Sequence, residues 1–115
     1  MKKVLIVDDN EKFQDLCKNL LSERYEVISA LSIPQAQGMF AAYRFKGFHI
    51  IAVDGCVPGT ELNTTTLVKE IRQTFFRNMI AISSIPEFRK KLMEAGCNLE
   101  CEKDNLVKLL LEMPT

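Results

Sequence analysis

The stretch that decides the fold of this chain is His49-Ile50-Ile51-Ala52-Val53-Asp54-Gly55-Cys56-Val57-Pro58. An apolar run of strand-like length ends in one carboxylate and is followed at once by a turn. Such a run favours a central strand of a parallel sheet, covered on both faces. Ligands of these sheets bind outside the carboxyl ends of the strands, which is where Asp54 stands. Aspartate is also a common turn residue, so on this stretch alone both interpretations of Asp54 stay open.

The composition is that of one soluble globular domain. The 115 residues are near the common domain size, with 47% hydrophobic and 26% charged residues. Fifteen basic residues balance fifteen acidic ones, so no net charge attracts DNA, RNA or an anionic membrane. Asp8 and Asp9 end the amino-terminal apolar run too early for a signal peptide, and no run reaches the ~20 residues that span a bilayer. We therefore expect a cytoplasmic protein without direct nucleic-acid or membrane binding.

The four cysteines form no Cys-x-x-Cys pair, and His49 is the single histidine. A zinc cluster is therefore not expected. In the cytoplasm these thiols should be reduced, and most should fill small spaces in the core. Cys56 is the one expected to be partly exposed, because it follows Asp54 on a turn.

Apolar runs and helical patterns alternate along the whole chain. Right-handed crossovers through helices then predict a parallel sheet with helices on both faces. We expect a doubly wound α/β fold in one domain over residues 1–115. The expected strands are 3–7, 25–30, 50–53, 79–82 and 98–101, and the expected helices are 11–23, 33–43, 65–75, 86–95 and 104–112.

Polar residues mark the start of three expected helices. Asn10, Ser32 and Asp104 each precede a helical pattern as candidate N-caps, and Pro34 suits a first turn. Gly96 is expected to end the fourth helix. The first expected helix places five apolar residues on one face: Phe13, Leu16, Cys17, Leu20 and Leu21.

If the strands are parallel, their carboxyl ends gather five polar side chains at one edge: Asp8, Asp9, Asp54, Ser83 and Lys103. Carboxylates about 4 Å apart repel by on the order of 4 kcal/mol at an effective dielectric constant near 20. Such a cluster needs a cation, and oxygen ligands of this kind suit Mg²⁺. The sequence therefore predicts a magnesium site at this edge.

A carboxylate beside Mg²⁺ can also attack a phosphoryl group and form an acyl phosphate. The metal and a lysine ammonium offset charge on the phosphoryl oxygens, and a serine hydroxyl can donate a hydrogen bond to them. Each residue also has a structural interpretation: Asp8 and Asp9 as helix caps, Ser83 as a turn residue and Lys103 as a solvated charge. Their placement after four different strands favours a shared site.

The chain resembles the receiver domain of two-component response regulators. The similarity covers essentially the whole chain, and its motifs in combination are specific to that family. The matching segments are Lys3-Val4-Leu5-Ile6-Val7-Asp8-Asp9-Asn10, Val53-Asp54 with Val57-Pro58-Gly59, Ile80-Ala81-Ile82-Ser83-Ser84, and Gly96 with Lys103.

The resemblance implies a flavodoxin-like sheet of five strands in the order 2-1-3-4-5, with five helices. It implies a phosphorelay module that promotes its own Mg²⁺-dependent phosphorylation and dephosphorylation, and not a turnover enzyme. Asp54 would accept a phosphoryl group from a sensor histidine kinase or a phosphotransfer protein. Asp9 and the Cys56 backbone carbonyl would bind Mg²⁺ together with Asp54, and Asp8 would assist through a water. Lys103 would pair with the phosphoryl group, and Ser83 would be the switch hydroxyl.

Three features depart from that family. Asp104 follows Lys103 where the family usually has proline, and this second carboxylate could compete for the lysine. Glu100 stands where a switching Tyr or Phe is common, and the segment 59–66 lacks the usual Asp-Gly and is slightly longer. The phosphorylation site thus looks complete while the output side differs.

Two alternatives stand beside the phosphoacceptor. A pseudo-receiver would serve only as a protein-interaction or dimerisation module, which Glu100 and Asp104 favour and the intact acids oppose. A hydrolase with an aspartyl-phosphate intermediate is disfavoured, because the Asp-x-Asp pattern is absent at Asp54 and little chain is left for a substrate cap. The chain could be a single-domain regulator acting on an effector protein, or the receiver of a longer one.

Overall fold

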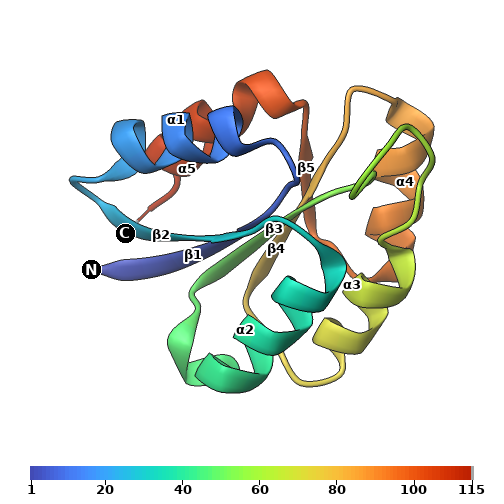
Figure 1. The fold of residues 1–115 in the computed structure, drawn as a ribbon, viewed down its shortest axis with the longest axis horizontal. Helices are drawn as coiled ribbons and strands as arrows, with labels where there is room; N and C mark the ends of the chain where they lie inside the picture. The colour runs from blue at the N-terminus through green and yellow to red at the C-terminus, as the bar shows by residue number, and fades with distance from the viewer. Residues whose placement is uncertain (115) are drawn as a thin grey trace.

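The apolar runs of the sequence form five parallel strands in the order β2-β1-β3-β4-β5 (Figure 1). The structure is a computed structural model that describes residues 1–114, with the backbone alone for residues 43–46. The strands are β1 (Lys2–Val7), β2 (Tyr25–Ala30), β3 (Ile50–Asp54), β4 (Asn78–Ile82) and β5 (Leu99–Cys101). The helices are α1 (Glu11–Leu21), α2 (Ile33–Gly47), α3 (Thr65–Arg72), α4 (Pro86–Ala95) and α5 (Leu106–Glu112), with a 3-10 turn η1 (Lys103–Asn105) before the last. The doubly wound, flavodoxin-like α/β fold expected from the sequence is confirmed.

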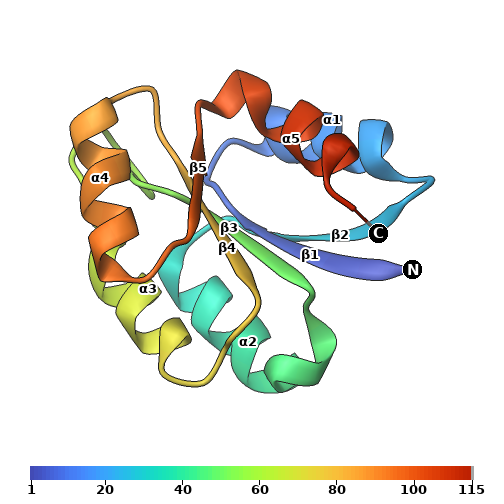
Figure 2. The same ribbon diagram turned by 180° about the vertical axis from the view of Figure 1, so that it is seen from behind.

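The sheet is buried on both faces because side chains alternate along each strand. In β1, Leu5 and Val7 pack in the cluster that includes residues of α2, α3 and α4, whereas Val4 and Ile6 pack in the cluster with residues of α1 and α5. Figures 1 and 2 show the same division, with α1 and α5 on one face and the other three helices opposite. The buried central strands therefore fix the positions of the residues that follow their carboxyl ends.

Two of the three predicted N-caps are confirmed. The side chain of Asn10 accepts a hydrogen bond from the Phe13 N–H at 3.0 Å, and that of Ser32 accepts from the Gln35 N–H at 3.2 Å. The prediction that Asp104 caps the last helix is wrong. Asp104 lies inside η1, and α5 starts later, after Asn105, with no side-chain cap.

Several helix ends also differ from the expected ones. α1 ends at Leu21 and not at residue 23, α3 ends at Arg72 and not at 75, and α2 continues to Gly47 beyond the expected 43. Gly96 does end α4, with a φ of 146° that favours glycine. Helix ends are set by local hydrogen bonds that the apolar period does not encode.

The predicted apolar face of α1 is partly wrong. Its buried residues are Gln14, Cys17 and Leu21, whereas Leu16 and Leu20 are 51% and 54% exposed. The helix is rotated toward Gln14 because the amide of this residue hydrogen-bonds to backbone carbonyls beneath it, to Ile6 at 2.8 Å among others. These bonds satisfy the NH2 end of the buried amide, whereas its Oε1 has no hydrogen-bond partner among the described residues.

The cysteines lie as expected except for Cys101, which is partly exposed like Cys56. Cys17 and Cys97 are buried, Cys56 and Cys101 are half-buried, and all four are free thiols. Burial is the largest influence on each and raises the pKa of Cys17 to about 11 and of Cys97 to about 12. Within residues 1–114, none of the helices has both the length and the apolar character needed to cross a membrane.

Candidate functional site

Hydrogen bonds that continue the sheet bring the five predicted side chains to one edge. The Asp8 N–H donates to the Ala30 carbonyl at 3.0 Å, and the Ser83 N–H donates to the Cys101 carbonyl at 3.3 Å. Between them, Asp54 pairs with Ile82 as the last residue of β3. The ends of β1, β3, β4 and β5 are thus in register at this edge.

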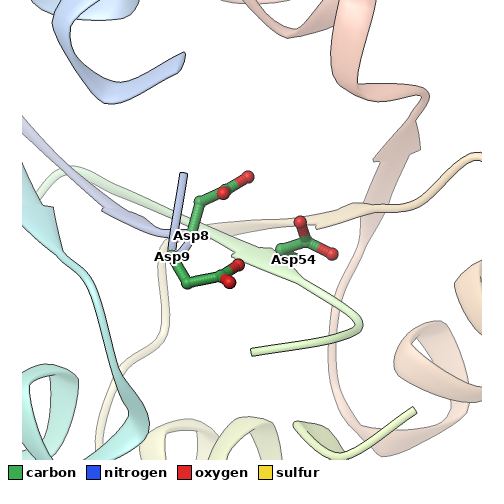
Figure 3. Close-up of side chains that lie close together, drawn as sticks. All are labelled: Asp8, Asp9 and Asp54. Carbon is green, nitrogen blue, oxygen red and sulfur yellow. The ribbon is translucent and has the colours of Figure 1, made fainter. Parts of the chain in front are cut away.

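The three aspartates form one cluster. Asp8 and Asp9 at the end of β1 lie beside Asp54 at the end of β3 (Figure 3). Each contributes a carboxylate oxygen, and the three oxygens lie within 4.8 Å of one another. Asp8 is fully buried, Asp54 is half-buried and Asp9 is exposed, so the cluster opens toward solvent on one side.

Lys103 provides the positive charge nearest this cluster in the structure. Its Nζ lies 2.8 Å from Asp8 Oδ2 and 3.5 Å from Asp54 Oδ2. The same ammonium lies 4.9 Å from the centroid of the Phe13 ring, which adds a cation–π contact. Partial burial lowers the pKa of Lys103, but the two carboxylates outweigh it, so its pKa is raised overall. The lysine therefore stays charged between the aspartates.

Asp54 is unusually reluctant to ionise. Burial is the main cause and raises the pKa of its carboxyl from 3.8 to about 6. The Cys56 N–H, which donates to Asp54 Oδ1 at 3.1 Å, works in the opposite direction. Asp8 adds to the rise, and Lys103 offsets part of it. A charge or hydrogen-bond donor arriving at this carboxylate would therefore have a large effect on its ionisation.

An open cavity of about 620 Å³ lies over the cluster. Asp9, Asp54, Ser83, Lys103 and Cys56 are among its lining residues, while Asp8 lies beneath. Ser83 Oγ accepts a hydrogen bond from the Ile85 N–H at 3.0 Å. This bond fixes the oxygen and leaves the hydroxyl proton for another acceptor. The site residues predicted from the sequence are thus brought together around one space.

The segment after β3 is held by two residues that sequence reasoning missed. Thr64 is buried, and its hydroxyl shares its proton between the carbonyls of Asp54 at 2.8 Å and Gly55 at 3.2 Å. Asn63 accepts from the Val57 N–H at 2.8 Å and donates to the Val57 carbonyl at 2.9 Å. These bonds close the loop back onto the strand end and position Asp54. A polar pair just before a helix is a weak signal, since caps look the same.

Glu100 and Asp104, the two residues near the carboxyl end that depart from the receiver-domain pattern, have different surroundings. Glu100 pairs with Arg89 of α4 at 2.9 Å, and the same guanidinium donates to the Ser83 carbonyl at 2.7 Å. This position thus carries an ion pair to α4. In the part of the chain that the structure describes, Asp104 forms no ion pair with Lys103, so the competition predicted for it is not seen.

The cluster fits a hard divalent cation. All three candidate side-chain ligands are carboxylates, and Mg²⁺ is bound in proteins by one or two carboxylates with several waters kept. One face of the cluster is open for those waters, since Asp9 is exposed and lines the cavity. Three carboxylates face one ammonium here, and this excess of negative charge also favours binding of a cation.

The arrangement of strands and helices is similar to that of solved response regulators and their receiver domains. A two-component response regulator from Clostridium difficile superposes with a TM-score of 0.81 at 17% identity, over 96% of this chain and 90% of that one. A response regulator from Burkholderia pseudomallei, with a phosphorylated aspartic acid, a calcium ion and citrate, superposes with a TM-score of 0.81 at 20% identity. The match covers 96% of this chain and 65% of that one.

A CheY-like receiver domain protein from Methanospirillum hungatei gives a TM-score of 0.73 at 25% identity, over 97% of this chain and 89% of that one. No protein-family model matches the chain, and no curated protein matches it by sequence. The resemblance to receiver domains stated from the sequence is therefore confirmed at the level of the fold.

Proposed function

We propose that this chain is a phosphoacceptor receiver of a two-component phosphorelay, with Asp54 as the acceptor. The observation that carries the proposal is one constellation: three carboxylates, a lysine ammonium and a serine hydroxyl surround a single open cavity at the carboxyl edge of the sheet. Receiver domains are signalling modules and not turnover enzymes, and we propose the same for this protein.

The proposed reaction is an in-line transfer to the Asp54 carboxylate. One of its oxygens forms the bond to phosphorus while the bond from phosphorus to the donor's imidazole nitrogen breaks. Asp54 lines the cavity, so a donor side chain can approach it from solvent. Burial removes part of the water around the Asp54 carboxyl and so raises its pKa, and a poorly solvated carboxylate is a better nucleophile once it is ionised.

Lys103 and Ser83 then stabilise the transferred group. Lys103 Nζ lies only 3.5 Å from Asp54 Oδ2, so a small movement brings it to a phosphoryl oxygen attached there. The Ser83 hydroxyl proton is not taken up by the bond to Ile85, and it can be donated to a second phosphoryl oxygen. Ser83 therefore links the modification to the start of α4.

Asp8, Asp9, Asp54 and the Cys56 carbonyl would hold the Mg²⁺. When bound, the metal neutralises charge on the phosphoryl oxygens. Asp8 is fully buried and its Oδ1 accepts from the Asn10 N–H at 2.8 Å, so its carboxylate is held in place as a support for Asp9 and Asp54. We propose a sensor histidine kinase or phosphotransfer protein as donor and an effector protein as target, both in the cytoplasm.

The decisive experiment is brief treatment with acetyl phosphate and Mg²⁺, followed by intact mass measurement. We expect an acid-labile gain of one phosphoryl group, lost with a chelator and lost in Asp54→Asn. Asp15→Asn, which changes an exposed carboxylate of α1, is the matched control and should retain the gain. Uptake by Asp54→Asn at the wild-type rate would show that a different residue accepts the phosphoryl group.

The pseudo-receiver remains the second candidate because of the ion pair between Glu100 and Arg89 at the output side. That module would bind its partner or a second copy of itself without phosphate. It predicts no mass gain in the wild-type protein under conditions where the site binds Mg²⁺. The same experiment therefore separates the two functions.

A further inference from the structure

A second cavity of about 570 Å³ lies at the opposite edge of the sheet. It is lined by residues at the amino ends of three strands, Lys2 of β1, Ile50 of β3 and Asn78 of β4. The end of α5 reaches the same edge, where Figures 1 and 2 also place the start of β1. This cavity, which we term the basic cavity, is therefore separated from Asp54 by the length of the sheet.

The lining of the basic cavity carries charge of one sign. Its side chains include Lys2, Arg72 and Arg77, and none of the described residues that line it is an aspartate or glutamate. This is notable in a chain whose fifteen basic residues are balanced by fifteen acidic ones. We propose that the basic cavity binds a small oxyanionic molecule through phosphate or carboxylate groups.

His49 supplies a directed donor at this place. Its Nδ1 accepts a hydrogen bond from the Lys3 N–H at 3.1 Å, so the ring proton is on Nε2 and can be donated. Burial, and then the positive charges of Arg77, Lys2, the amino terminus and Lys3, lower the pKa of His49. These groups from β1, the amino terminus and the segment before β4 are all cationic, so the imidazole is a neutral donor in a positive field.

The cationic side chains divide into a support and two ligands. Arg72 is occupied, since its guanidinium donates to the carbonyls of Gly96 and Phe75 and to the side chain of Asn98, among others. Arg77 makes one side-chain hydrogen bond to the described residues, to the Phe48 carbonyl at 3.2 Å. The ammonium of Lys2 makes none to them. Arg77 and Lys2 therefore keep donors for an incoming oxyanion.

The remaining lining fits the same kind of ligand. The volume lies within the range of small-molecule sites in proteins, about 300–1,000 Å³. Asn78 Oδ1 accepts from Asn98 at 2.8 Å, which leaves the Asn78 amide as a further donor. Phe76 is 84% exposed at the rim, so its ring is available to an apolar part of the ligand. This inference does not depend on phosphorylation at Asp54.

The single histidine makes a clean test possible. We would follow the His49 imidazole by NMR as a function of pH in metal-free buffer, with pyrophosphate, with citrate, and with sodium chloride at equal ionic strength. An anion held next to the ring should raise the pKa of His49 by about 0.5 or more above the chloride value. Pyrophosphate distinguishes a phosphate ligand and citrate a carboxylate ligand.

Variants decide whether the response comes from the basic cavity. Arg77→Gln should lose most of the anion-induced rise, whereas Lys90→Gln, an exposed cation on α4, should retain it. Arg77 is exposed, so its variant should fold, and the dispersion of its amide spectrum checks this. The proposal is overturned if neither anion differs from chloride, or if Arg77→Gln responds like the wild type.

Discussion

Asp54 must satisfy two opposing demands. In the proposed function its carboxylate has to be ionised to bind a cation or attack phosphorus, yet burial and the neighbouring Asp8 raise its pKa to about 6. Lys103, at 3.5 Å, offsets only part of this. At neutral pH the ionised Asp54 carboxylate is therefore a destabilising charge in the folded protein.

The first prediction is that Asp54→Asn stabilises the metal-free protein at pH 7. A rise in pKa from 3.8 to about 6 corresponds to at most ~3 kcal/mol, and we expect an increase of about 1–3 kcal/mol in unfolding free energy. The folded state holds this proton more tightly than the unfolded chain. The wild type thus gains stability as pH falls from about 6 toward 4, and its difference from the variant shrinks.

Urea denaturation in chelator at pH 7 and pH 4.5 tests this prediction, with Asp15→Asn as the control for loss of an exposed charge. The control measures the effect of losing an exposed carboxylate at each pH, and Asp54→Asn should exceed it at pH 7. A variant that is less stable than the wild type at pH 7 would mean that the pair with Lys103 outweighs burial and the repulsion from Asp8.

The second prediction concerns Lys103, whose ammonium stands where it balances Asp8 and Asp54 in place of a metal. Lys103→Ala should leave Mg²⁺ affinity unchanged or increase it up to about fivefold, because removing a cation worth ~1 kcal/mol favours another. Under the proposed function it should also impair signalling, since Lys103 would be the partner of the phosphoryl group on Asp54. Calorimetric titration with Mg²⁺ measures the affinity, and Lys108→Ala on α5 is the control. A large loss of affinity would show that Lys103 organises the metal site.

At the scale of elements, one side chain of α4 bonds to residues of two neighbouring chain segments. Arg89 is 17% exposed and bonds both Glu100 of β5 and the carbonyl of Ser83 at the end of β4. Glu100, at 44% exposed, has only this partner among the described residues. Arg89 is therefore expected to contribute more to stability than Glu100.

The third prediction follows from this inequality. Arg89→Ala should lower the unfolding free energy by about 1–2 kcal/mol, because the Ser83 carbonyl loses a charged donor. Glu100→Ala should cost no more than about 0.5 kcal/mol, as exposed ion pairs usually do. Urea denaturation of both variants and of Lys90→Ala measures this. Equal losses in both would place the stabilising energy in the ion pair and not in the bond to Ser83.

Across the whole molecule, repeating sequence patterns predicted the strands and the helices. Contacts that form only when the chain folds could not be predicted. Alternating apolar runs predicted the parallel sheet, and the polar residues after four strands predicted the cluster of Asp8, Asp9, Asp54, Ser83 and Lys103. The roles of Thr64 and Gln14 could not be predicted. They bond to the carbonyls of Asp54 and Ile6, respectively, which lie in preceding strands, and nothing local distinguishes them from surface polar residues.

The same limit explains the errors. Leu16 and Leu20 fit the helical apolar spacing of α1, but burial of Gln14 turns that side outward. Asp104 is of a residue type common at N-caps, but η1 intervenes before α5, and the first residue of η1, Lys103, pairs with Asp8. In both places a tertiary contact outweighs a local preference.

Hydrogen bonds between residues distant in sequence also hold the carboxyl end of α5 in place. The start of β2 closes the carboxyl end of α5: the Tyr25 hydroxyl donates to the Leu110 carbonyl at 2.8 Å, and Arg24 donates to the carbonyls of Leu111 and Met113. Those carbonyls belong to the group that a helix leaves without partners of its own. An edge strand and the final helix, 85 residues apart along the chain, thus support each other.

The fourth prediction is that Tyr25→Phe lowers the unfolding free energy by about 1–2 kcal/mol, because it leaves the Leu110 carbonyl unsatisfied beside a ring that is only 2% exposed. Ser29→Ala on the same strand is the matched control, since the buried Ser29 hydroxyl has no hydrogen-bond partner among the described residues. It should be neutral or slightly stabilising. Both are measured as urea midpoints with unchanged slope. If Tyr25→Phe behaves like Ser29→Ala, the end of α5 is held by Arg24 and packing, and its docking does not need the tyrosine hydroxyl.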